Sequence, residues 1–230
     1  MKAPRKLSMP LPPAALSRLA ICYQVALRAG EDGKENLLSA QLAKLLKVDE
    51  TLFRKDMAMV GIVGKPRKGY PVGEIIVRLE GILGLSEFTN AILIGCGFLG
   101  HALLRYSGFG KYGLRITAAF DADHKKVGQH IGDYVVLPME KCRSIIETFR
   151  IQVAILAVPA NRVQELTDWL VERGVTGIWN FAPVQLKVPL QVVVRNENLA
   201  VGLVQLIHHM KSSRLSSELE DLDTMKASNE

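Results

Sequence analysis

The sequence Ala91-Ile92-Leu93-Ile94-Gly95-Cys96-Gly97-Phe98-Leu99-Gly100 joins a short, continuous apolar run to a glycine-rich turn. Four apolar residues in a row are typical of a buried parallel strand. The turn has the pattern G-x-G-x-x-G, in which Gly95 permits a tight turn, Gly97 lets a pyrophosphate approach the backbone and Gly100 lets a helix pack on the strand. The N–H groups at the start of that helix would face the phosphates. The stretch therefore predicts the opening strand, turn and helix of a dinucleotide-binding domain.

A second apolar run, 114–120, ends at a carboxylate. This residue, Asp121, lies 21 positions after Gly100, close to the spacing of about 20 at which an acidic side chain bonds an adenosine ribose. We expect its carboxylate to accept the ribose hydroxyls and to repel a 2′-phosphate, which favours NAD over NADP. A glycine-rich turn in an α/β sheet that binds no cofactor is the alternative interpretation.

The remainder of the C-terminal two thirds alternates between strand and helix. Apolar runs at 153–158, 175–181 and, less clearly, 192–194 resemble the first strand, and the pattern at 162–173 is helical. Strands that alternate with helices predict a doubly wound parallel sheet, an α/β fold. The stretch 199–210 is apolar on nearly every helical turn, so we expect it to be buried.

The first third of the chain has the pattern of a small helical domain. Residues 14–29 place apolar groups at helical spacing and end at Gly30, which we expect to be the C-cap. Two short helices follow within 39–60, the first with Ser39 as its expected N-cap, and together they predict a helix–turn–helix. Residues 61–72 are rich in glycine, proline and basic side chains and predict a hairpin with a cationic tip.

The excess positive charge of the chain lies in this first third. The formal net charge is +6; residues 1–80 hold 14 Lys/Arg and 8 Asp/Glu, whereas the rest of the chain holds 15 of each. A cationic segment joined to a neutral remainder predicts a module that binds a polyanion such as nucleic acid. A solvated basic face with no partner is the alternative interpretation.

Composition argues against several other classes of protein. Hydrophobic residues make up 48% of the chain, yet no apolar stretch approaches the roughly 20 residues of a bilayer span, and the N-terminus lacks the apolar core of a signal peptide. The three cysteines, Cys22, Cys96 and Cys142, have neither metal nor redox spacing. We therefore expect a cytoplasmic protein with no membrane segment and no metal site.

The sequence offers no group that stands out as catalytic. None of the five tyrosines is followed four positions later by lysine, so the Tyr-x-x-x-Lys pair of short-chain dehydrogenases is absent. A nucleotide fold without catalytic residues, joined to a basic helix–turn–helix, favours a sensor over an enzyme. Two alternatives stay open. One is a small NAD-binding oxidoreductase or CoA-ligase-type protein with a basic appendage; the other is a DNA-binding protein whose dinucleotide fold serves only for dimerisation.

Several segments in both halves resemble the Rex family of bacterial redox-sensing transcriptional repressors. The resemblance spans about Pro12 to Met210 and includes the G-x-G-x-x-G turn. The other matching segments are Arg54-Lys55-Asp56-Met57-Ala58-Met59-Val60-Gly61, Gly69-Tyr70-Pro71-Val72, Ile82-Leu83-Gly84-Leu85, Ala119-Phe120-Asp121-Ala122-Asp123, Val158-Pro159-Ala160 and Asn180-Phe181-Ala182-Pro183-Val184.

The resemblance implies a homodimer whose N-terminal winged helices bind an inverted-repeat operator in double-stranded DNA. It also implies that the Rossmann domains hold NAD(H), that the final helix is swapped between subunits, and that NADH favours release from DNA. The implied domains are 1–85 (winged helix), 86–198 (Rossmann), 199–212 (swapped dimerisation helix) and 213–230 (acidic flexible tail). The implied DNA-binding residues are Lys47, Arg54, Lys55, Lys65, Arg67 and Lys68. The implied cofactor-binding residues are Gly95, Cys96, Gly97, Phe98, Leu99, Gly100, Tyr106, Asp121, Val158, Pro159 and Phe181.

Some positions depart from the family pattern. Ala58-Met59-Val60-Gly61 stands where the recognition helix usually ends in Ser-Tyr-Phe-Gly, and Pro66-Arg67-Lys68 replaces the usual Arg-Gly-Val of the wing. Asn198 stands where the family has an acid that acts with an arginine, matched here by Arg18, in the switch that reports cofactor state. An amide cannot form a charge-assisted pair with Arg18. We therefore expect altered coupling and a divergent paralogue.

Overall fold

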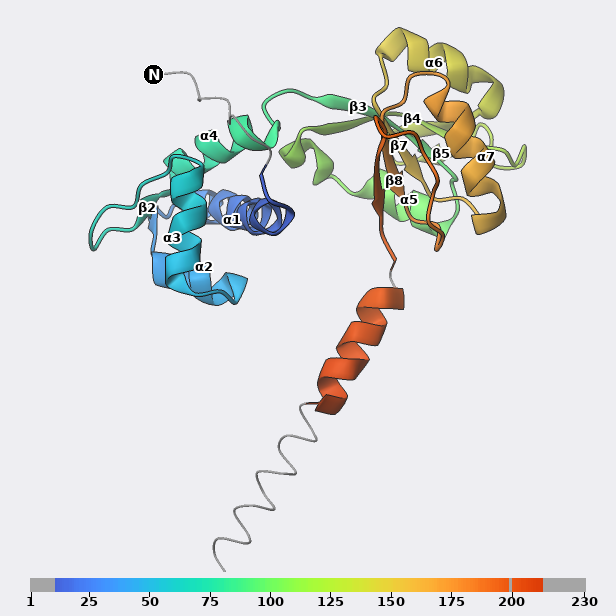
Figure 1. Cartoon of the computed structure of the whole chain (residues 1–230). Coiled ribbons are helices and arrows are strands. Elements are labelled where there is room, and N and C mark those ends of the chain that lie inside the picture. The colour runs from blue at the N-terminus through green and yellow to red at the C-terminus, as the bar shows by residue number, and fades with distance from the viewer. Residues whose placement is uncertain (1–10, 199, 213–230) are drawn as a thin grey trace, which may run out of the picture. The chain divides into compact units, whose positions relative to one another are not determined.

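The computed structural model describes residues 11–198 and 200–212. These residues fall into two compact units (Figure 1). The N-terminal unit comprises residues up to Phe88 together with Gly108–Leu114. The C-terminal unit comprises Thr89–Ser107 and the residues from Arg115 onward. The expected acidic tail, 213–230, lies outside the described residues.

The N-terminal unit is mainly helical. Its two short strands pair antiparallel, with Leu37 opposite Tyr70, and a bridge between Lys65 and Gly69 closes the loop that precedes the second strand. The elements in chain order are α1 (Pro13–Glu31), β1 (Asn36–Leu37), α2 (Ser39–Leu46), α3 (Glu50–Met59), β2 (Tyr70–Pro71) and α4 (Val72–Leu83). The two short helices expected within 39–60 are α2 and α3.

Two expected helix caps are wrong. Leu38 occupies the N-cap position of α2, and the Ser39 hydroxyl instead donates a hydrogen bond to Glu50 at the start of α3. Gly30 lies inside α1, which continues to Glu31 with Asp32 as its C-cap, and the glycine with a positive φ is Gly33, at +72°. The sequence offered two glycines near this helix end, and the one that adopts the left-handed conformation is the later one.

The core of this unit joins its three longest helices. Leu19 of α1, Phe53 of α3 and Leu79 of α4 are almost fully buried in one cluster. Phe53 meets Tyr70 edge to face, with ring centroids 5.6 Å apart. This packing fixes α3 beside the strand that follows the 61–69 loop, so the exposed faces of α3 and of that loop are held on one rigid body.

Residues 108–114 pack with the N-terminal unit, although the residues just before them, Thr89–Ser107, belong to the C-terminal unit. They contain η1 (Phe109–Tyr112), whose Tyr112 ring lies edge-on to Tyr23 of α1 at 6.3 Å. The Tyr23 hydroxyl is 3.3 Å from the Lys111 carbonyl, and Lys111 Nζ is 2.6 Å from Glu31 Oε1. The chain therefore passes between the two units three times.

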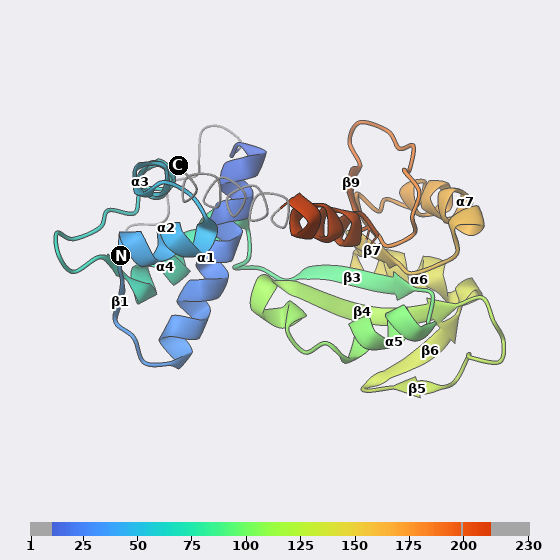
Figure 2. The same ribbon diagram turned by 90° about the horizontal axis from the view of Figure 1, so that it is seen from below.

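The C-terminal unit is built on a seven-stranded sheet in the order β5-β6-β4-β3-β7-β8-β9. Figure 2 shows β3, β4 and β6 side by side in this sheet. Its β3–β7, β4–β6, β7–β8 and β8–β9 pairs are parallel, and β5–β6 is antiparallel. The strands are β3 (Thr89–Ile94), β4 (Leu114–Asp121), β5 (His130–Ile131), β6 (Tyr134–Pro138), β7 (Val153–Leu156), β8 (Gly177–Asn180) and β9 (Val193–Asn196). The helices are α5 (Phe98–Arg105), η2 (Met139–Lys141), α6 (Cys142–Phe149) and α7 (Ala160–Val171).

Helices cover both faces of this sheet. Ile92 and Ile94 of β3 share a buried cluster with residues of α6 and α7, whereas Leu93, which points to the opposite face, lies against Gly100 of α5. On one side of β3 lie β4 and then β6, and on the other side lie β7, β8 and β9 in turn, so among these strands the ones later in the chain lie farther from β3 on each side. This is the strand order of a Rossmann-like α/β fold, and it confirms the expected mostly parallel sheet.

A final helix spans 200–212, and its described side chains are exposed. It begins after Asn198, whose side-chain oxygen accepts the Ala200 N–H at 3.0 Å, a favourable N-cap contact. Burial was expected for 199–210, but this single chain does not provide it; Leu199 itself lies outside the described residues. The exposed large apolar side chains are Val201, Leu203, Val204, Leu206, Ile207 and Met210. Within residues 11–198 and 200–212, no helix is long and apolar enough to cross a membrane.

Candidate functional site

The glycine turn between β3 and α5 has the geometry expected from its sequence. Gly95 has φ +100°, and a Cβ there would lie 2.4 Å from the Ala157 carbonyl oxygen. A Cβ on Gly100 would lie 2.0 Å from the Gly95 carbonyl oxygen, so only glycine allows α5 to approach the turn this closely. Gly97, by contrast, borders open space. The start of α5 is therefore open in front of Gly97, as an approaching phosphate requires.

Asp121, at the end of β4, is tied to this turn. Its carboxylate accepts the Cys96 N–H at 2.7 Å and the Asp123 N–H at 2.8 Å, and Lys126 Nζ lies 2.9 Å from Oδ2. Burial alone would raise the pKa of this carboxyl, but the three donors outweigh burial and hold the pKa below its ordinary value. Asp121 is thus an ionised group at the edge of the turn. The sequence indicated its position and not these three partners.

A cleft of about 710 Å³ opens at the carboxyl ends of β3, β4 and β7. This is the place where strand order diverges on either side of β3, and ligands of doubly wound sheets bind there. Of the expected cofactor residues, the cleft is lined by Gly95, Asp121, Val158 and Pro159. The others are not among its lining residues.

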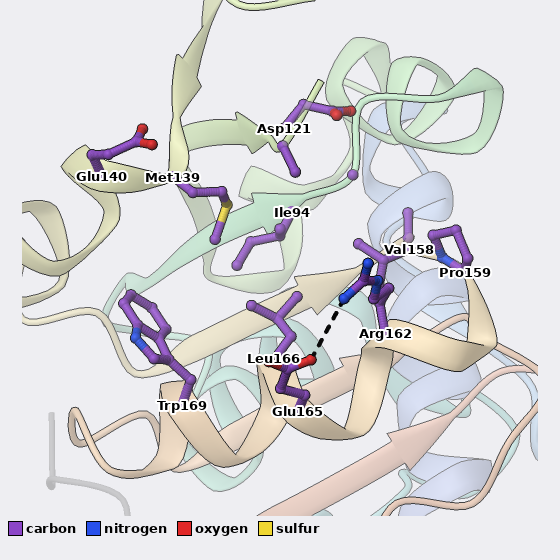
Figure 3. A pocket seen from close by; sticks show the side chains of 13 residues that line it. Ile94, Asp121, Met139, Glu140, Val158, Pro159, Arg162, Glu165, Leu166 and Trp169 are labelled. Atoms are coloured by element: carbon purple, nitrogen blue, oxygen red, sulfur yellow. Dashed lines mark ion pairs between the residues drawn. The ribbon is translucent and has the colours of Figure 1, made fainter. Parts of the chain in front are cut away.

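One wall of the cleft was missed by sequence reasoning. Arg162, Glu165, Leu166 and Trp169 project from one face of α7 towards the cleft, across from Asp121 (Figure 3). Arg162 and Glu165 form an ion pair at 3.8 Å. The spacing of these four residues, at intervals of three or four, is a helical stripe that the sequence does contain. Met139 and Glu140, which follow β6, also line the cleft.

The expected cofactor residues outside the cleft lining have varied environments. Cys96 is buried and burial raises the pKa of its thiol to about 11, so it is a poor nucleophile. Phe98 is fully exposed, Leu99 and Tyr106 are also exposed, and Tyr106 follows the last turn of α5. Phe181 is half-buried and lies 5.1 Å from the ring of Trp179.

The N-terminal unit presents its cations around a second hollow. A cavity of about 630 Å³ lies between the start of α2, α3 and the 61–69 loop, and Arg54, Lys65 and Arg67 line it. Arg54 also pairs with Glu50, one turn earlier in α3. All six expected DNA-contacting residues are exposed: Lys47, Arg54, Lys55, Lys65, Arg67 and Lys68. The unit thus offers a cationic surface around a concave apolar floor.

Arg18 has a partner that the sequence did not indicate. Its guanidinium donates two hydrogen bonds to Asp56 of α3, Nε to Oδ2 at 2.5 Å and Nη2 to Oδ1 at 2.9 Å. The Asp56 side chain is only 4% exposed, and the pair joins α1 to the middle of α3. Asn198, the other expected switch residue, caps the final helix. The roles of Arg18 and Asn198 in the switch, and the altered coupling expected from the amide at position 198, stay predictions.

Across residues 11–198 and 200–212, no group of three or more His, Cys, Asp or Glu side chains is placed to hold a metal ion. Cys22 and Cys142 are buried, and burial raises the pKa of each thiol to about 12. These thiols therefore fill core positions.

Two units define the class of this protein. The C-terminal unit is a Rossmann-like domain with an open glycine turn, and the N-terminal unit is a helical domain with an exposed cationic face. The class is therefore a nucleotide-binding fold joined to a basic helical module. Residues 86–184 match the family model described as a CoA binding domain.

Known proteins place the chain within this class. The redox-sensing transcriptional repressor Rex of Treponema denticola is 38% identical over 84% of this chain and 93% of its own length. The Rex repressor of Chloroflexus aurantiacus is 39% identical over 80% and 88%. A solved Rex-family repressor, RSP, is 29% identical with a TM-score of 0.81 and covers 93% of this chain and 100% of its own. The structure of RSP with NAD⁺ and operator DNA gives a TM-score of 0.81 at 30% identity, over 93% and 98%.

The chain belongs to the Rex family of redox-sensing transcriptional repressors. The resemblance read from the sequence motifs is therefore confirmed. Members of this family are repressors and not enzymes, which sets aside the oxidoreductase and CoA-ligase alternatives.

Proposed function

We propose that this chain is a repressor that binds NAD(H) in the cleft of its C-terminal domain and an inverted-repeat operator through its N-terminal domain, and that NADH favours release. The main support is the open glycine turn, tied to an ionised Asp121 at the mouth of the cleft. RSP, which aligns with nearly the whole chain, has been solved with NADH and with NAD⁺ and operator DNA. The proposed setting is the bacterial cytoplasm.

The cleft suits an adenosine–pyrophosphate ligand. Its floor is apolar, with Ile94 and Leu166 facing the space, and the ionised Asp121 stands at its rim. In this proposal the open N-terminus of α5 receives the pyrophosphate, and the Asp121 side of the cleft receives the adenosine. Tyr106 and Phe181 would lie towards the nicotinamide.

The N-terminal unit acts in this proposal as a winged helix. Helix α3 is the recognition helix, entering the major groove with Arg54 and Lys55, and the 61–69 loop is the wing that contacts phosphates. The Asp49 side chain caps α3 by accepting the Thr51 N–H at 2.7 Å, and the Arg18–Asp56 pair holds the helix against α1. The domain boundaries proposed are 1–85 and 86–198, with 108–114 packing back on the first domain.

Removal of single cations should separate base contacts from phosphate contacts. Arg54→Ala should cost about 1–3 kcal/mol of operator affinity and relax sequence preference if it contacts a base edge. Lys68→Ala should weaken binding to all duplexes and reduce the slope of log affinity against log salt by about one. Fluorescence anisotropy at several salt concentrations measures both effects. Lys187→Ala, at an exposed lysine of the other domain, is the matched control; equal behaviour of all three variants would contradict the DNA surface.

We also propose that helix 200–212 packs against a second copy of the chain, swapped between subunits. Six large apolar side chains on one helix are exposed, including Val204 at 65% and Met210 at 58%, and an apolar patch of this kind marks an interaction surface.

The double variant Leu203→Glu with Leu206→Glu should convert the protein from dimer to monomer in sedimentation equilibrium. Gln205→Glu, which adds a charge to the same helix, should leave it dimeric. A wild-type monomer at micromolar concentration would contradict this assembly.

A further inference from the structure

The turn that follows β4 carries charges of both signs beside the proposed adenosine site. Asp121 ends the strand, and Lys126 returns to it five residues later, with Nζ 2.9 Å from Oδ2. The Lys126 side chain is 35% exposed, whereas the Asp121 side chain is 9% exposed. The ammonium is therefore the more exposed member of the pair, and it touches a carboxylate that lines the cleft, although Lys126 itself is not among the lining residues.

The ammonium of Lys126 changes how Asp121 affects the selectivity between NADH and NADPH. An acid at the end of the second Rossmann strand favours an unmodified ribose because it accepts the hydroxyls and repels a 2′-phosphate. Here the carboxylate charge is offset by a neighbouring ammonium, and two of its acceptor positions already hold the Cys96 and Asp123 N–H groups. The repulsion that Asp121 exerts on a phosphate is correspondingly weaker.

Lys126 can also contribute an attraction. A lysine side chain has a flexible stem and three donors, and an ammonium forms charge-assisted hydrogen bonds with phosphate oxygens. Because Lys126 is partly exposed, its ammonium can leave Asp121 for a nearby phosphate without losing a fully buried contact. Lys125, its neighbour, is exposed but is not paired with Asp121 in this way.

We propose that Lys126 is a specificity-determining residue that narrows the preference of the cleft for NADH over NADPH by offsetting the charge of Asp121 and by serving as a donor to a 2′-phosphate. This inference rests on the proposed function, since it assumes that the adenosine ribose lies beside Asp121. The sequence pattern attributes the selectivity for NADH over NADPH to Asp121 alone. In this proposal Lys126, which lies outside the glycine motif, determines part of that selectivity.

The test compares two cofactors on four proteins. The dissociation constants of NADH and NADPH are measured by calorimetry for the full-length wild type, Lys126→Gln, Lys126→Arg and Lys125→Gln. Lys126→Gln should raise the ratio of the NADPH constant to the NADH constant by at least about tenfold, the worth of one charge-assisted hydrogen bond. Lys126→Arg should keep the wild-type ratio, and Lys125→Gln should change it by less than about twofold.

The ratio separates selectivity from a structural role. If Lys126 only positioned Asp121 and the turn, its loss would weaken both cofactors together and leave the ratio unchanged, which would overturn the proposal. A Lys125→Gln effect as large as that of Lys126→Gln would overturn it too, because a general electrostatic field would then account for the result. Failure of the wild type to bind either cofactor would instead contradict the proposed function, and the proposal with it.

Discussion

Replacement of Arg18 by methionine is expected to lower the free energy of unfolding of the N-terminal domain by about 3 kcal/mol. The substitution keeps the aliphatic stem but leaves the Asp56 carboxylate, which is 4% exposed, without its bidentate partner. A buried carboxylate without a compensating charge is costly, and Asp56 lies in the middle of the proposed recognition helix. Operator affinity should therefore fall as well. Denaturant unfolding followed by circular dichroism measures the stability change.

Two further variants test whether the ion pair is responsible. Arg28→Met makes the same substitution at an exposed position of α1 and should have little effect. The double variant Arg18→Met with Asp56→Leu removes both charges and should recover part of the lost stability, because a buried ion pair can be replaced by apolar groups at little net cost. A single variant as stable as the wild type would mean that the pair does not hold α3 against α1.

Gly100→Ala should reduce NADH affinity by roughly a hundredfold. A Cβ at this position would lie 2.0 Å from the Gly95 carbonyl oxygen, which is backbone and cannot rotate away. The turn and α5 must then separate, at a cost of up to about 3 kcal/mol, equivalent to about two orders of magnitude in affinity. Calorimetric titration with NADH measures the effect, and the melting temperature of the variant should fall at the same time.

Gly97→Ala provides the informative comparison. A Cβ there meets nothing within 4 Å in the protein, so stability should be unchanged while the added methyl group occupies the expected place of the pyrophosphate. Gly73→Ala, at an equally open glycine in α4, should leave NADH affinity unchanged and should not lower stability, because alanine is the better helix former. Full NADH affinity in Gly97→Ala would show that the pyrophosphate does not approach this turn.

The parts of the fold that the sequence predicted are those determined locally. The apolar run before Gly95 and the runs at 153–158, 175–181 and 192–194 correspond to β3, β7, β8 and β9, because buried parallel strands need continuous apolar residues. The short β5, of two residues, and the neighbouring β6 were not predicted. Their periodicity covers too few residues to stand out from a loop, and β5 pairs antiparallel beyond the parallel set.

The parts that could not be predicted depend on contacts between distant residues. The docking of 108–114 on α1 rests on Tyr23 and Tyr112, which are 89 positions apart in the chain. The partner of Arg18 was unexpected for the same reason: Asp56 was noted only as part of a family motif. The position of Asp121 at the end of β4 could be predicted from its spacing to the glycine turn. That Arg162, Glu165, Leu166 and Trp169 of α7 face the cleft could not, because it depends on how the helix packs on the sheet.

Operator affinity in the two cofactor states tests the central claim most directly. The measurement is fluorescence anisotropy of an inverted-repeat duplex, selected for binding in the presence of NAD⁺, titrated with the full-length protein under saturating NAD⁺ and then under saturating NADH. Because a coupling free energy of about 1–3 kcal/mol is typical of linked sites, operator binding should be at least about fivefold weaker under saturating NADH than under saturating NAD⁺. By linkage, operator DNA should then weaken NADH binding relative to NAD⁺ binding by the same factor. Equal operator affinity in the two states, with both cofactors shown to bind, would contradict the account.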